Sequence, residues 1–314
     1  MKILIVGGAG FIGSVLVKKL LLEGNEIIII DKLSLGNVKN IDQDLVSFYE
    51  MNINNIESVL KILTNHSNID EVWHLAANSD ISGGVDSIDI DLNDTFMSTV
   101  SVLKIMKKIK CKKIYFASSS AIYGVNDNKL HEDIGPLLPI SNYGAMKLSS
   151  EALISASLES FLKKVCIYRF PNVVGVPATH GVILDFMRKY KKDRTILEVL
   201  GNGFQQKVYL HVDELVDAMC FISKNTKKGM NYFNIGAADD GVMVKQIAEE
   251  ITKVISPQAK INYQKTDRGW PGDVPYFSYS IEKLKKLGWS PKMSSLAAIK
   301  KAIKEIALQE RLIK

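Results

Sequence analysis

The sequence predicts an α/β protein built on a doubly wound parallel β-sheet, with a smaller second region interleaved with it towards the C-terminus. Two observations carry this prediction. Short β-branched runs alternate with longer segments whose apolar residues recur every three or four positions through the first half of the chain. The short runs are almost continuously apolar, as expected of strands that helices cover on both faces. Right-handed crossovers between such strands then give the doubly wound arrangement.

Six apolar runs in the first half are predicted to be strands of this sheet. They lie at residues 2–8, 25–33, 45–53, 70–77, 112–120 and 164–175. Between them, residues 11–24 and 97–110 have the apolar spacing of helices.

The pattern becomes less regular after Gly175, where Pro, Gly and aromatic residues interrupt it. Residues 230–237 nevertheless read as one more strand of the sheet, so we expect the second region to interleave with the first. The predicted division is a cofactor-binding domain at 1–174, with 205–238 returning to it, and a substrate-binding region at 175–204 and 239–314.

Composition excludes several classes of protein. The 314 residues are 46% hydrophobic and 24% charged, which is typical of a globular chain with a substantial core. The net charge of +6 is modest and its longest basic block is residues 107–113, so no nucleic-acid partner is predicted.

Cysteine and histidine usage predicts no disulfide framework and no metal site. The three cysteines are far apart, which indicates a reducing compartment, and no His or Cys pair has the spacing of metal ligands. The apolar N-terminus reads as a strand and helix, not a signal peptide, and no run is long enough to cross a membrane. We therefore expect a cytoplasmic protein without a membrane partner.

A glycine-rich turn follows the first predicted strand. Two registers overlap there, Gly8-x-Gly10-x-x-Gly13 and Gly7-x-x-Gly10-x-x-Gly13. Either lets the backbone approach a pyrophosphate at a helix N-terminus, where unpaired N–H groups and the helix dipole favour negative charge. Gly13 would let the helix pack closely on the strand. A turn without any ligand is the alternative interpretation.

The second predicted strand ends at Asp31, which strengthens the dinucleotide interpretation. Asp31 lies 18 residues beyond Gly13, where a carboxylate can accept hydrogen bonds from ribose hydroxyls. The neighbouring residue is Lys32, and no Arg stands there to receive a 2′-phosphate. The predicted cofactor is therefore NAD in preference to NADP.

Two Tyr-x-x-x-Lys matches occur, Tyr143/Lys147 and Tyr279/Lys283, and their context separates them. The first follows the helix-start signal Ser141 and comes after Ser119, at the end of a predicted strand. Ligands bind at that edge of open α/β sheets. The second match lies outside the strand–helix alternation, and we expect it to be a surface pair.

The spacing of Tyr143 and Lys147 suggests acid–base chemistry. Residues i and i+4 share one helix face, about 5–6 Å apart at Cβ. An ammonium so placed favours the phenolate, so we expect Lys147 to lower the pKa of Tyr143. A tyrosine tuned in this way can exchange a proton with a sugar hydroxyl, and Ser119 can hydrogen-bond the same oxygen.

Taken together, these motifs resemble those of a known family, the extended short-chain dehydrogenase/reductases that act on nucleotide sugars. The resemblance rests on ordered motifs over nearly the whole chain: GGAGFIG, Asp31, HLAA at 74–77, SSSAIYG, YGAMK and RFPNVVG at 169–175. The pattern is most similar to that of the UDP-glucose 4-epimerases. The resemblance implies a Rossmann-type fold, NAD, dimerisation through helices, and a nucleotide-diphosphate sugar as substrate.

The resemblance also assigns residues. Ser119, Tyr143 and Lys147 would be catalytic: Tyr143 would take the C4 hydroxyl proton as the C4 hydride leaves the sugar, and Lys147 would hold the nicotinamide ribose. The hydride then returns to the other face of the 4-keto sugar. The implied cofactor contacts are Gly7, Gly10, Phe11, Ile12, Gly13, Asp31, Lys32, Asn52, Ile53, Leu75, Ala76, Ala77, Tyr143, Lys147 and Pro171. The implied substrate contacts are Ser79, Ser119, Ser120, Tyr143, Asn172, Lys207 and Arg268.

Residues after Ser119 help to choose the reaction. In this resemblance, sugar 4,6-dehydratases of the family have Thr-Asp-Glu at the positions of residues 119–121, because eliminating water needs an added acid and base. This chain has Ser119-Ser120-Ala121, which favours epimerisation. A C4 dehydrogenase or keto-reductase using the same three residues stays open as the alternative, with a 4,6-dehydratase behind it.

Several positions depart from the epimerase pattern. Asn52 stands in place of a common Asp, Thr95 in place of Asn, Lys207 in place of a phosphate-binding Arg, and Trp270 in place of an Arg before Gly-Asp. Lys207 keeps the charge but loses the bidentate fork of arginine. These differences leave the nucleotide and the sugar open.

Overall fold

The structure is a computed structural model that describes residues 1–80, 84, 87–126, 128–266, 274 and 276–313. The chain forms two compact units that interleave along the sequence. The first comprises Met1–Ile122, Leu138–Arg169 and Val216–Phe233. The second comprises Tyr123–Leu137, Phe170–Leu215 and Asn234–Lys314.

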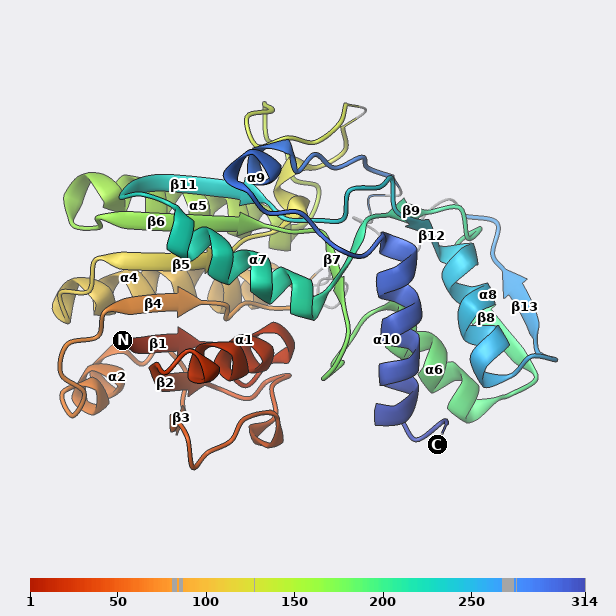
Figure 1. Cartoon of the computed structure of the whole chain (residues 1–314), viewed down its shortest axis with the longest axis horizontal. Helices are drawn as coiled ribbons and strands as arrows, with labels where there is room; N and C mark the ends of the chain where they lie inside the picture. Colours follow the sequence, from red (N-terminus) through yellow and green to blue (C-terminus); the bar gives the residue numbers. More distant parts are fainter. Residues whose placement is uncertain (81–83, 85–86, 127, 267–273, 275, 314) are drawn as a thin grey trace. The chain divides into compact units, whose positions relative to one another are not determined.

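In the described part of the chain, the first unit is built on a seven-stranded sheet with the order β11-β6-β5-β4-β1-β2-β3 (Figure 1). Every pairing from β3 through β6 is parallel. The doubly wound sheet predicted from the sequence is thereby confirmed, including the late strand that returns to its edge. The strands are β1 (Lys2–Val6), β2 (Glu26–Asp31), β3 (Ser47–Glu50), β4 (Glu71–His74), β5 (Lys113–Ala117), β6 (Lys164–Arg169) and β11 (Gly229–Asn234).

Helices cover both faces of this sheet. Figure 1 shows α1 and α7 on one face and α4 and α5 on the other. The helix expected at 97–110 begins earlier, because a π-helical turn at Leu92–Met97 leads into α4. The helices are α1 (Phe11–Leu22), α2 (Ile56–Leu63), α3 (Ile88–Asp91), α4 (Ser98–Lys108), α5 (Asn142–Ser160) and α7 (Val212–Asn225).

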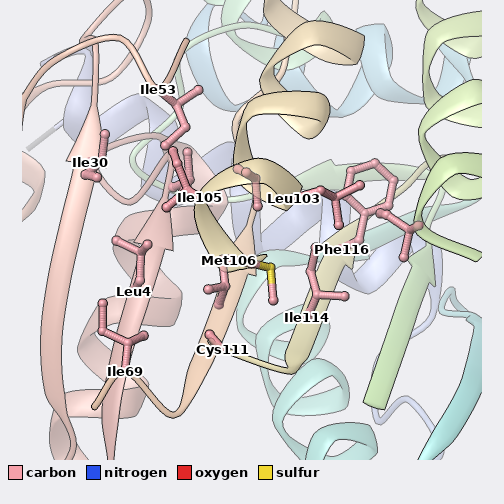
Figure 2. Close-up of a cluster of buried hydrophobic side chains, with 14 of the residues drawn as sticks. Leu4, Ile30, Ile53, Ile69, Leu103, Ile105, Met106, Cys111, Ile114 and Phe116 are labelled. Carbon is pink, nitrogen blue, oxygen red and sulfur yellow. The ribbon is translucent and has the colours of Figure 1, made fainter. Parts of the chain in front are cut away.

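The core of the first unit explains why the apolar runs become strands. The side chains of Leu4, Ile30 and Ile114 are no more than 1% exposed. They pack with Phe116 and Met106 between the sheet and α4 (Figure 2). Each such side chain contributes roughly 1.5–3 kcal/mol by leaving water. A strand that faces this layer on one side and α1 or α7 on the other has no polar face.

The second unit has three two-stranded sheets in its described residues. Parallel pairs join β7 (Asn172–Val174) to β10 (Tyr209–His211), and β8 (Ile196–Val199) to β13 (Lys260–Tyr263). The antiparallel pair is β9 (Gln206–Lys207) with β12 (Val242–Met243). Its helices are α6 (Val182–Lys192), α8 (Val244–Ile255), α9 (Glu282–Leu287) and α10 (Ser295–Gln309).

Two expectations about the fold are wrong. The run at 164–175 is not one strand: β6 ends at Arg169 and β7 starts at Asn172, because Pro171 has no N–H to continue a ladder. Tyr279 is not a surface residue: it is 2% exposed, and its hydroxyl donates to Asn234 Oδ1 at 3.1 Å. A tyrosine ring is readily buried when its hydroxyl finds such a partner.

Cys111, Cys166 and Cys220 are buried free thiols. Among the described residues, every helix is too short or too polar to traverse a bilayer.

Candidate active site

The glycine-rich turn joins β1 to α1 in the first unit. Gly7 has a φ of +86°, which strains other residue types, and its N–H donates to Ile30 O at 2.9 Å. A Cβ at Gly7 would lie 2.6 Å from Ala76 N. A Cβ at Gly13 would lie 2.1 Å from Gly7 O. The turn therefore needs glycine at both positions to bring α1 against the strand ends.

Gly10 differs from these two glycines because space is open beside it. It is the N-cap of α1, its backbone is extended, and it supplies no side-chain cap to the helix. A Cβ there would meet only Gly7 O, at 3.6 Å. The first N–H groups of α1, at Phe11 and Ile12, thus remain available for an anion. This cradle fits the pyrophosphate of a dinucleotide.

Asp31 stands at the end of β2 and organises the turn. Its Oδ2 accepts from Ala9 N at 2.9 Å and its Oδ1 from Leu33 N at 2.8 Å. A carboxylate has about four acceptor sites, so capacity for ribose hydroxyls remains. Lys32 forms an ion pair with Asp94 at 2.6 Å, which engages the cation beside Asp31. This arrangement suits NAD better than a cofactor with a 2′-phosphate.

The loops after β3 and β4 hold the other predicted cofactor residues of this unit. The N–H groups of Leu75 and Ala76 both donate to Val6 O at 2.9 Å, which sets this loop beside the glycine turn. Ala77 and the predicted substrate contact Ser79 follow and are partly exposed. After β3, Asn52 Oδ1 accepts from the Asn54 N–H at 2.9 Å. The Ile53 side chain packs into the core, so a cofactor contact there would come from its backbone.

The first turn of α5 lies against the residues that follow Ser119. Ser141 caps the helix by accepting from Gly144 N at 3.1 Å, as the sequence predicts. A Cβ at Gly144 would lie 2.6 Å from Ala121 O. Glycine at this position therefore lets the Tyr143 turn approach the serine-bearing segment.

Ser119, Tyr143 and Lys147 come together at this place. The Ser119 hydroxyl is hydrogen-bonded to the Tyr143 phenol and also accepts from Ala121 N at 3.1 Å. Lys147 Nζ lies 5.7 Å from the centre of the Tyr143 ring and donates to Ala117 O at 2.6 Å. Lys147 is only 2% exposed.

Burial decides the electrostatics of the three residues. It raises the pKa of Tyr143 well above its usual value, with a smaller raising effect from Asp91, while the Ser119 hydrogen bond acts in the opposite direction. The expected lowering of the Tyr143 pKa by Lys147 is therefore wrong for the protein alone. Burial also lowers the pKa of Lys147, to about 7, against the raising effects of Glu151 and Asp91. Lys147 is thus only partly charged at neutral pH.

Two buried acidic residues next to this centre were missed from the sequence. Asp91 is 1% exposed: its Oδ1 accepts from Asn78 Nδ2 at 3.0 Å, and its Oδ2 has no partner among the described residues. Burial raises the pKa of Asp91. Glu151 is one helical turn beyond Lys147, and that i, i+4 spacing is a signal that could have found it. No local pattern marks Asp91.

The remaining predicted residues belong to the second unit or lie outside the described residues. Pro171 directly precedes β7, Asn172 is its first residue, and Lys207 is on β9. Arg268 and Trp270 lie outside the residues that the structure describes. Ser120 belongs to the first unit, at the start of the short helix η3 (Ser120–Tyr123).

Comparison with known proteins shows the family of this chain. The family described as NAD dependent epimerase/dehydratase matches residues 3–236. The chain belongs to this family. Its members of the extended short-chain dehydrogenase/reductase type are enzymes that use NAD, and the glycine cradle and Asp31 of this chain fit that cofactor.

Individual relatives align over almost the whole chain. A UDP-glucose 4-epimerase of Lactobacillus helveticus is 28% identical, covering 93% of this chain and 92% of that protein. A UDP-glucuronate 4-epimerase of Thermodesulfobacterium geofontis is 25% identical, covering 96% and 94%. The crystal structure of a UDP-glucose 4-epimerase from Thermotoga maritima with UDP-glucose has a TM-score of 0.88 at 29% identity, covering 99% and 100%.

Proposed function

We propose that this protein is an NAD-dependent nucleotide-sugar 4-epimerase of the UDP-glucose/UDP-galactose type. The observation that carries the proposal is the meeting of Ser119, Tyr143 and Lys147 at the sheet edge that also holds the glycine cradle. Relatives aligned over more than nine-tenths of the chain are 4-epimerases of UDP-sugars. In this proposal the first unit binds NAD, and Asn172, Lys207 and Arg268 remain the substrate contacts that the family resemblance implies.

NAD, when bound, supplies reversible hydride transfer at C4 of the sugar. The residues of this chain manage the proton. Tyr143, as the phenolate, takes the proton of the C4 hydroxyl and returns it once the 4-keto sugar has presented its other face. In this proposal the Ser119 hydroxyl, which favours the ionised form of Tyr143 in the protein alone, hydrogen-bonds the C4 oxygen of the sugar. No proton is gained or lost over the cycle.

Lys147 assists this proton transfer from its position beside Tyr143. Its ammonium points to Ala117 O at the end of β5 and lies beside the Tyr143 ring. In the proposal it also donates to the nicotinamide ribose. A negative Tyr143 would raise the pKa of Lys147, since opposite charges favour each other's charged form. The two groups would therefore be charged together before the transfer, and Tyr143 becomes neutral as it takes the substrate proton.

The absence of a carboxylate at position 121 argues against elimination. In this chain Ala121 lies beside the first turn of α5, next to Gly144. A dehydratase would need an acid and a base near the sugar in addition to Tyr143. The nearby Asp91 is buried and hydrogen-bonded to Asn78, which suits it poorly to that work.

The experiment is an incubation of the purified protein with UDP-glucose, UDP-galactose, their N-acetyl forms and UDP-glucuronate. We expect interconversion of C4 epimers without net NADH. Release of a 4-keto-6-deoxy product without NADH would show a dehydratase, and a 4-keto product with stoichiometric NADH would show a C4 dehydrogenase. Preference for UDP-glucuronate would keep the reaction class and correct the sugar.

A homodimer and a cytoplasmic location are part of the proposal. Ile88 and Ile90 on α3 are 55% and 41% exposed, which leaves apolar surface on a helix for a second copy to cover. Light scattering with size-exclusion chromatography will give a mass of twice 34.9 kDa if this is right. A single 34.9 kDa species would remove the dimer from the proposal.

A further inference from the structure

A buried ion pair lies directly behind the candidate catalytic residues. Arg169, the last residue of β6, donates from Nε to Glu151 Oε1 at 3.1 Å and from Nη2 to Glu151 Oε2 at 2.7 Å. The side chains are 8% and 6% exposed. The guanidinium also lies over the Tyr232 ring, 5.3 Å from its centre. All three residues belong to the first unit.

Stability alone is a poor reason for such a pair. Taking two charges out of water costs several kcal/mol per ion, and well-packed apolar residues often serve the fold equally well or better. The contacts that such a pair makes with other groups can therefore indicate its role. Here Glu151 contacts Ser118, which precedes Ser119, and it lies on the same helix as Lys147.

The first connection passes through Ser118. Its hydroxyl donates to Glu151 Oε1, and its N–H donates to Tyr168 O at 2.8 Å. The residues on either side are also held: Lys147 Nζ donates to Ala117 O, and Ser119 Oγ accepts from Ala121 N. Three consecutive residues are therefore fixed by separate contacts, and the orientation of Ser119 follows from the anchor at Ser118.

The second connection is electrostatic. Glu151 lies four residues after Lys147 on α5, so both side chains share one helix face. Besides Glu151, the charged or titratable groups around Lys147 are Tyr143 on α5, His74 on β4 and Asp91 on α3. Burial keeps the His74 pKa at about 3, so that group is neutral.

Glu151 is therefore the anion best placed to oppose the desolvation of Lys147. Glu151 raises the Lys147 pKa more than Asp91 does. Asp94 on the neighbouring π-helical turn is already paired with Lys32.

We propose that Glu151, held in place by Arg169, is a positioning residue of this active site. Through Ser118 it orients the strand end that carries Ser119, and from one turn along α5 its carboxylate favours the ammonium form of Lys147. The inference rests on the proposed function, because it assumes that Ser119, Tyr143 and Lys147 run the reaction.

Three single variants separate the two connections. Glu151→Gln keeps the shape and removes the charge; Ser118→Ala keeps the charge and removes the anchor. The control is Glu71→Gln: this other buried glutamate accepts from Tyr115 OH at 3.0 Å and from Lys113 Nζ at 3.3 Å. Glu71 begins β4, at the amino ends of the strands, whereas Ser119 follows the carboxyl end of the neighbouring strand β5.

The Lys147 pKa is measured by nitrogen NMR titration of the lysine side chains, with the signal assigned from Lys147→Met, and kcat is followed against pH. Glu151→Gln is expected to lower the Lys147 pKa by about 1 and to reduce kcat about tenfold above neutral pH, because the ammonium fraction falls tenfold. Ser118→Ala is expected to reduce kcat with the Lys147 pKa unchanged. Glu71→Gln is expected to change neither.

An unchanged Lys147 pKa in Glu151→Gln overturns the electrostatic role, and an unchanged kcat in Ser118→Ala overturns the anchoring role. Equal losses of kcat and melting temperature in all three variants would show a merely structural pair and overturn both. If Glu151→Gln does not fold, Ser118→Ala and the wild-type titration still decide the anchoring role. A wild-type protein that converts no nucleotide sugar refutes the proposed function, while the Lys147 titration in Glu151→Gln still tests the electrostatic part of this inference.

Discussion

The glycine turn yields a prediction in which two neighbouring glycines behave differently. Replacing Gly13 by Ala puts a Cβ 2.1 Å from Gly7 O and 2.8 Å from Gly8 Cα. Both neighbours are backbone, so the strand end or α1 has to move. Overpacking of this kind costs about 1–3 kcal/mol or more. At about 3 kcal/mol the melting temperature falls by about 6–12 °C.

Gly10→Ala is the matched variant. Its Cβ meets only Gly7 O, at 3.6 Å, and the φ of −76° suits any residue, so the melting temperature of the protein without ligand should stay within about 2 °C of wild type. The methyl group occupies the space through which a pyrophosphate would reach the N–H groups of α1. A loss of about 1.4 kcal/mol or more makes the Kd for NAD at least about tenfold weaker.

Thermal unfolding without ligand and calorimetric titration with NAD measure the two effects separately. The reasoning is refuted if Gly13→Ala melts like wild type, because the backbone contact would then be absent. It is also refuted if Gly10→Ala binds NAD as tightly as wild type, because the anion would then lie elsewhere.

Three further outcomes are expected. Tyr143→Phe should lower kcat by at least about 100-fold while the Kd for NAD stays within about twofold, since only the proton carrier is lost; turnover near the wild-type rate would remove Tyr143 from the mechanism. Lys147→Met should abolish turnover yet stabilise the protein without ligand by about 1–3 kcal/mol at pH 7, because the folded state lowers the Lys147 pKa from 10.5 to about 7 and disfavours its charge. Between these two pKa values the unfolded state holds a proton on Lys147 that the folded state lacks, so the stability gain of Lys147→Met should shrink as pH rises towards 10.5. Denaturant unfolding at several pH values measures this gain, and a gain that does not change with pH would contradict the prediction. His74 has a folded pKa of about 3 against 6.5, so stability should fall by up to about 1.4 kcal/mol per pH unit as pH drops below 6.5, and less in His74→Gln; equal slopes would contradict the assignment.

The sequence was most reliable where one local pattern contained the whole cause. The glycine turn lies between a strand and a helix within about 20 residues, and its spacing already requires close backbone packing. The Ser141 cap and the i, i+4 pair Tyr143/Lys147 are likewise properties of one helix. These features were predicted and observed in the same places.

The failures involve groups that meet only after folding. Tyr279 is buried by Asn234, 45 residues away in sequence, so a search for local strand–helix alternation could not place it. Arg169 reaches Glu151 across 18 residues, and Asp91 meets Asn78 across 13. Only the assembled sheet and helices bring these partners together.

The sequence by itself predicted the doubly wound sheet, the glycine turn with Asp31, and the candidate residues Ser119, Tyr143 and Lys147, because strand and helix periodicities record which side chains share a face. The tertiary structure decided how those residues are charged. Burial lowers the pKa of Lys147 and raises that of Tyr143, and the ionic neighbours Glu151 and Asp91 come from different helices. Desolvation depends on everything packed around a group, most of it distant in sequence, and no local spacing records it.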